Sequence, residues 1–129
     1  MKAPRPTRDR GAAASEFAML AGLVCVLLLA AMQLAFALHV RNTATAHVIE
    51  GARLGARVDS DPATGAQRAR ELIAESLPGG RGVTVSSGRT SVDGIAVVEV
   101  SARVRLPVVG PFGPGGAMTV TGHAYAEEQ

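Results

Sequence analysis

The order of apolar and polar residues divides the chain into a long apolar run, an amphipathic continuation and a region of alternation. Residues 17–38 contain one polar side chain, the amide of Gln33, and no formal charge. As a helix rising about 1.5 Å per residue, this run is roughly 33 Å long and can cross a hydrocarbon core of about 30 Å. The pattern therefore predicts a membrane-spanning helix over residues 12–38.

The helix is expected to extend well beyond the apolar run. The sequence from residue 13 to 57 is rich in helix-forming Ala and Leu, and no proline interrupts it before Pro62. A narrow apolar stripe follows one side of its second half: Val40, Ala44, Val48, Ala52 and Gly55. Such a stripe suits packing against a small domain or against neighbouring helices.

A second helix is predicted over residues 62–76. Asp61 is a suitable N-cap, and Pro62 fits the first helical position because its missing N–H has no partner there in any case. Pro78-Gly79-Gly80 marks the end of this helix. Its expected buried stripe consists of Ala66, Ala69, Leu72, Ile73 and Leu77.

The apolar period changes to two after the second helix, which predicts strands over residues 83–92, 95–106 and 118–126. Asp93-Gly94 is a dipeptide favoured in two-residue hairpins, and Gly88 is a candidate bulge in the first strand. The expected fold is α+β, with a three-stranded antiparallel meander and helices across its apolar face.

The charges are distributed unevenly. Residues 1–10 carry four cations and one acid, whereas arginines and acidic residues are equal in number over residues 39–129. A basic N-terminal leader keeps the N-terminus cytoplasmic and directs the domain after the helix outward. Because the basic residues are confined to the leader, the net charge does not indicate nucleic-acid binding.

The candidate chemistry outside the leader is sparse. His39, His47 and His123 are scattered and lack the spacing of a zinc site, so neither a metal nor a cofactor is expected. Cys25 lies in the middle of the apolar run, where it suits lipid contact or packing. No nucleophile elbow or phosphate loop is present, which disfavours an enzyme.

The leader allows three interpretations. A secretory signal peptide would use Ala35-Phe36-Ala37 as its cleavage site, but its apolar region should be about 7–15 residues long, shorter than the run here. In a plain single-pass anchor, Gly11 is incidental and Glu16 reaches the membrane surface. The third interpretation treats the basic leader ending at Gly11, with Glu16 and Phe17 beyond it, as one processing signal.

The third interpretation rests on a family resemblance. A short basic leader ending in Gly, followed by Glu at the fifth and an aromatic residue at the sixth mature position, is similar to substrates of prepilin peptidases. Here these positions are Gly11, Glu16 and Phe17, with Ala12 as the new N-terminus. The string RGAAASEFAML, the apolar helix and RNTATAHVIEGARLGAR together resemble TadE-like proteins of the Tad (Flp) pilus system over residues 8–57.

The resemblance implies a structural, non-enzymatic subunit, a minor pilin or pseudopilin of a pilus or secretion apparatus. It implies a cytoplasmic leader over residues 1–11, a membrane helix over 12–38 and an extracytoplasmic domain over 39–129. Its implied partners are the membrane, a prepilin peptidase, other pilins and components of the Tad secretion machinery. The alternative is an uncleaved, membrane-anchored binding domain unrelated to pili.

The resemblance implies a role for the acidic residue of the helix, and the spacing of the small residues indicates another. In the family's assembly model, Glu16 would accept the α-amine of a neighbouring subunit. Phe17 follows Glu16 as the aromatic residue of the same motif. Small residues at a spacing of four allow another helix to approach closely. In this chain they are Ala14, Ala18 and Gly22 in the membrane half, and Gly51 and Gly55 in the outer half.

Overall fold

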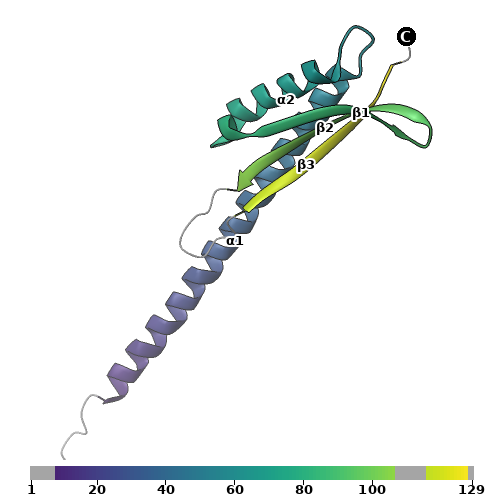
Figure 1. The fold of residues 1–129 in the computed structure, drawn as a ribbon. Helices are drawn as coiled ribbons and strands as arrows, with labels where there is room; N and C mark the ends of the chain where they lie inside the picture. The colour runs from purple at the N-terminus through teal and green to yellow at the C-terminus, as the bar shows by residue number, and fades with distance from the viewer. Residues whose placement is uncertain (1–7, 107–115, 128–129) are drawn as a thin grey trace, which may run out of the picture. The chain divides into compact units, whose positions relative to one another are not determined.

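The computed structural model describes residues 8–106 and 116–127. Its elements are α1 (Arg8–Gly55), α2 (Pro62–Ser76), a short 3₁₀ helix η1 (Gly80–Gly82), β1 (Thr84–Val92), β2 (Ile95–Leu106) and β3 (Gly116–Tyr125) (Figure 1). The expected α+β class, with a long first helix, a second helix and a three-stranded antiparallel sheet, is confirmed. The chain forms two compact units, Met1–Ala35 and Phe36–Gln129.

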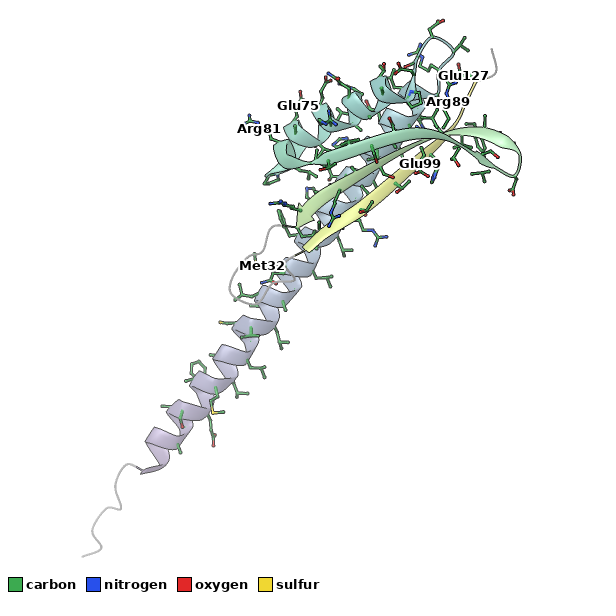
Figure 2. The ribbon with its side chains drawn as sticks, in the orientation of Figure 1. Met32, Glu75, Arg81, Arg89, Glu99 and Glu127 are labelled. Carbon is green, nitrogen blue, oxygen red and sulfur yellow. The ribbon has the colours of Figure 1, made fainter. Side chains whose placement is uncertain are left out.

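In the first unit, the described residues form the apolar part of α1. This helix begins at Arg8, five residues earlier than expected, and it is long and apolar enough to cross a membrane; its most apolar window has a mean hydropathy of 2.4. Its most apolar window is 0% buried, and the exposed side chains include Met32, which is labelled in Figure 2. A helix that is apolar on all sides is stable only where something other than water surrounds it.

In the second unit, the remaining part of α1 supplies one side of the core. The stripe predicted from the sequence is buried, and Ala56 extends it: Val40, Ala44, Val48 and Ala52 are each 0–2% exposed. Ala66, Ala69 and Ile73 of α2 join the same core, as does Leu77 just after the helix, whereas Leu72 is only half-buried. The side chains are small, so the two helices and the sheet pack closely.

The sheet has the order β1-β2-β3, with both neighbouring pairs antiparallel (Figure 1). The predicted two-residue hairpin is present: Asp93 (φ 52°) and Gly94 (φ 81°) both have positive φ, as a type I′ turn requires. The predicted bulge at Gly88 is wrong. Gly88 pairs with Glu99 in a register that is unbroken from Thr84 to Val92, because a glycine permits a bulge without requiring one.

The two faces of the sheet differ in burial. Val98, Val100, Ala102 and Val104 of β2 alternate towards the helices and are 0–4% exposed. The other face carries mostly Ser, Thr and charged side chains. Val97 is the departure from this alternation: it lies on the outer face between Thr90 and Tyr125 of the neighbouring strands, yet it is only 2% exposed.

Candidate functional site

The predicted processing signal lies in the first turns of α1. Gly11 and Ala12 are helical and exposed, and nothing lies within 4 Å of the position that a Cβ on Gly11 would occupy. The Ser15 hydroxyl donates to the Ala12 carbonyl at 2.8 Å. A peptidase that reads an extended backbone must therefore unwind this end, which is where a helix has the fewest internal hydrogen bonds.

Glu16 and Phe17 follow on the same helix. Phe17 is 74% exposed, and Glu16 is exposed as well. Within residues 8–106 and 116–127, Glu16 makes no ion pair. A carboxylate next to an apolar helix is costly in a membrane unless it finds a partner.

The small residues predicted for helix packing fall into two groups. Ala14, Ala18 and Gly22 are exposed, and no described atom lies within 4 Å of a Cβ built at Gly22. Gly51 and Gly55 are buried against α2. The structure therefore brings together the second group only, and within one chain rather than between subunits.

The contact between α1 and α2 centres on a glycine that the sequence analysis did not single out. A Cβ built at Gly51 would lie 2.5 Å from the Gly65 carbonyl oxygen, and one built at Gly65 would overlap the Gly51 carbonyl. Gly65 is an isolated glycine in an otherwise helix-forming segment. A glycine inside a helix lowers its stability unless close packing requires it. The isolated position of Gly65 is therefore the sequence feature that could have indicated the contact.

The start of α2 follows the prediction made from the sequence. An Oδ atom of Asp61 accepts a hydrogen bond from the Thr64 amide at 2.7 Å, and Pro62 occupies the first turn. This hydrogen bond lowers the pKa of the Asp61 carboxyl below its ordinary value of 3.8, and the charge of Arg89 acts in the same direction.

The histidines lie apart. His47 shares a hydrogen bond of 2.7 Å with Ser76, and His123 lies 2.9 Å from a carboxylate oxygen of Glu99 on the outer face of the sheet. In the part of the chain that the structure describes, no group of three or more His, Cys, Asp or Glu side chains is arranged to hold a metal ion.

Two hollows lie beside the sheet. One, of about 390 Å³, is lined by Val92, Val97, His123, Ala124 and Tyr125. Another, of about 270 Å³, lies at the end of α1; Arg57, Arg89 and Glu127 are its charged lining residues, the last two being labelled in Figure 2. The first hollow is mainly apolar and the second is mixed in charge.

Comparison with known families bears on the N-terminal region. Residues 11–53 match the family model of TadE-like proteins. The resemblance inferred from the leader and the apolar helix is therefore confirmed over this TadE-like segment, which begins at Gly11 and includes Glu16 and Phe17. The match covers less than half of the chain and excludes α2 and the sheet. Neither the curated proteins nor the solved structures yield a match.

Proposed function

We propose that this chain is a structural subunit of a Tad (Flp) type pilus or a related secretion apparatus, acting as a minor pilin or pseudopilin rather than as an enzyme. The observation that carries the proposal is the TadE-like match, because it spans the leader junction, the Glu16-Phe17 pair and the exposed apolar helix in one segment. The additional domain formed by α2 and the sheet supports a minor role, because the resemblance implies that the major fibre subunit of that system is a much shorter chain.

The subunit is held in the membrane by α1, with its leader in the cytoplasm, until a prepilin peptidase cleaves after Gly11. Cleavage removes the leader and its four cations, Lys2, Arg5, Arg8 and Arg10. Those charges anchor the helix end at the cytoplasmic surface, so their removal lowers the cost of drawing the helix out of the bilayer.

Cleavage also creates a positive α-amine on Ala12. Glu16 of a neighbouring pilin accepts this amine when the apolar helices pack together. In a medium of low dielectric constant, such a pair fixes the register of the two helices, because breaking it leaves an uncompensated charge. Ala14, Ala18 and Gly22 give the partner helix room to approach.

Mass spectrometry of the mature N-terminus tests the processing step in cells with an active prepilin peptidase. The wild type and Gly11→Ala, a control that keeps a small residue, are expected to begin at Ala12. Gly11→Leu is expected to leave the precursor in the membrane. A wild-type N-terminus at Leu38 would establish signal-peptidase cleavage instead, and an intact leader would favour the plain anchor.

A count of assembled pili tests the pairing step. Glu16→Ala is expected to insert and to be cleaved, but to reduce pilus number and co-purification with other pilins, because the neighbouring amine loses its counter-ion. Glu16→Asp is the matched control, since it keeps the charge. If Glu16→Ala is processed and assembles normally, the proposed amine–carboxylate pair is wrong while the cleavage site stands.

A further inference from the structure

The two edge strands of the sheet, β1 and β3, differ in how their outward-facing backbone N–H and C=O groups are covered. The register shows which groups these are. The Ala126 amide donates to the Ala96 carbonyl at 3.0 Å, so Ala96 and Ala126 form a hydrogen-bonded pair. In an antiparallel ladder such pairs alternate with pairs whose N–H and C=O groups point away. The outward-facing groups of β3 therefore belong to Ala117, Thr119, Thr121, His123 and Tyr125.

This outward row of β3 is unpaired over most of its length. All five residues are exposed, and among residues 8–106 and 116–127 no backbone hydrogen bond joins their outward groups to another element. The next outward amide, that of Glu127, does find a partner: it donates to the Ala56 carbonyl at the end of α1 at 2.9 Å. Glu127 therefore ties down the end of this edge, and the described part of the chain leaves the rest without a neighbouring strand.

The β1 edge is guarded instead. The Arg70 guanidinium of α2 donates to the Val85 carbonyl at 3.3 Å, and α2 packs against this strand. Arg89 adds a charge further along the same strand. Covering helices and edge charges are the devices by which proteins prevent unwanted strand pairing. Residues 116–125 of β3 contain no Lys, Arg, Asp, Glu or Pro, and the strand is ten residues long.

An apolar hollow lies at one end of the open edge. Its volume is about 390 Å³, and Val92, Val97 and Tyr125 are among its lining residues. The Tyr125 side chain is 70% exposed and Val92 is 47% exposed, so large apolar surface faces solvent where the edge strand ends. A hollow of this size accepts a large aliphatic or aromatic side chain.

We propose that the β3 edge is a docking site for an extended segment of a different protein, which adds a fourth strand to the sheet and places a large apolar side chain in the hollow. The row of unpaired N–H and C=O groups selects an extended backbone, and the adjacent hollow selects one side chain of that segment. The absence of formal charge along β3 favours an uncharged segment of Val, Ile, Thr or aromatic residues. This site lies outside the TadE-like segment and does not depend on processing at Gly11.

A second copy of the chain fits this edge less well. Its β1 edge is guarded by Arg70, and antiparallel pairing of β3 with itself over its full length sets Ala117 opposite Tyr125. The β3 strand of a second copy therefore brings only Ala117 and Thr119 to the hollow, and neither has a large apolar side chain. The occupant is therefore a strand of another polypeptide.

Photo-crosslinking of the full chain in its own cells tests the proposal. The photoreactive residue p-benzoylphenylalanine replaces Tyr125, a conservative exchange beside the hollow. A control probe replaces Ser86, which lies on the outer face of β1. The expected result is a cross-link from position 125, and none from position 86, to one segment of another protein, with probes at 121 and 123 reaching further residues of that same segment.

Edge-blocking variants then show whether backbone pairing holds the partner. Thr119→Pro removes an outward amide that the β2–β3 ladder does not use, and Thr119→Val keeps it. Cross-linking is expected to fall about fivefold or more in Thr119→Pro but not in Thr119→Val. Thr121→Lys, which places a charge on the edge without altering the ladder, gives the same loss and decides the matter if the proline variant fails to fold.

Three results would overturn the proposal. The first is a cross-link to a second copy of this chain, and the second is a cross-link that persists in both Thr119→Pro and Thr121→Lys. The third is equal labelling from positions 125 and 86. None of these depends on cleavage at Gly11, so the docking site and the proposed pilus role can fail separately.

Discussion

At the scale of single residues, Asp61 carries out two tasks at the start of α2. Its carboxylate accepts the Thr64 amide, which would otherwise lack a partner, and it lies within the field of Arg89. Both interactions favour the ionised form. The stability of the start of α2 therefore depends on pH through the exposed carboxyl of Asp61.

The stability that Asp61 contributes should be lost in acid. Because the folded-state pKa lies below the ordinary value of 3.8, the contribution is complete above that value and disappears as the pH falls through the folded pKa. Asp61→Asn keeps a capping side chain without a charge. In thermal unfolding of the full chain in detergent, the wild type should lose more melting temperature than Asp61→Asn between pH 5 and pH 3. Equal losses would contradict the assignment.

Gly94 should tolerate few replacements. Its φ of 81° belongs to the left-handed region, and nothing lies within 4 Å of a Cβ built there, so strain rather than collision decides the outcome. Gly94→Val should lower the free energy of unfolding by about 1 kcal/mol or more. Asp93→Asn, which also suits a positive φ, is the control and should unfold like the wild type. An unchanged midpoint in Gly94→Val would show that the turn does not restrain the hairpin.

At the scale of elements, close backbone contacts between glycines join α1 to α2. Gly65→Ala places a Cβ against the Gly51 carbonyl, and backbone cannot move aside as a flexible side chain can. Its free energy of unfolding should fall by about 1–3 kcal/mol in denaturant titration of the full chain. Gly82→Ala is the control, since nothing lies within 4 Å of its new methyl group. Equal midpoints for the two variants would contradict the close contact.

The elements that the sequence predicted are those with local signals. Asp61-Pro62 begins α2 and Asp93-Gly94 closes the hairpin, because capping and positive φ are decided by the residues themselves. The buried stripe of α1 follows from its period. Close approaches were not predicted: a Cβ at Gly122 of β3 would lie 2.7 Å from the Ile49 amide of α1, and nothing local indicates that contact. The alternation of β2 likewise does not indicate that Val97 on the outer face is buried, because its burial depends on neighbouring strands.

The candidate sites also divide into one that a local sequence pattern predicts and one that depends on the fold. The spacing of Gly11, Glu16 and Phe17 is a pattern along the sequence, so it could be recognised without a fold. The open edge of β3 could not, since it depends on which strand α2 and Arg70 cover. Sequence alternation indicates a strand but does not indicate whether that strand has a neighbour on both sides.

At the scale of the whole molecule, the charge distribution predicts the orientation in the membrane. Four cations precede the apolar helix, whereas the arginines and acidic residues after it balance. Lys and Arg in short segments next to a membrane helix favour the cytoplasmic side, and the leader is the segment where they predominate. In the proposed orientation, the domain containing the β3 edge is exported, where it can meet a partner strand.

A fusion after Gln129 tests this orientation. Alkaline phosphatase, which is active only after export, should be active when fused there, and a reporter that needs the cytoplasm should be silent. Replacing Lys2, Arg5, Arg8 and Arg10 by Gln removes the asymmetry and should reduce the exported fraction, because neither end of the helix is then favoured. As a control for expression, replacing Arg103 and Arg105 by Gln, far from the helix in sequence, should leave the exported fraction unchanged. A cytoplasmic signal from the wild-type fusion would contradict both the pilin proposal and the plain anchor, since both place the domain outside.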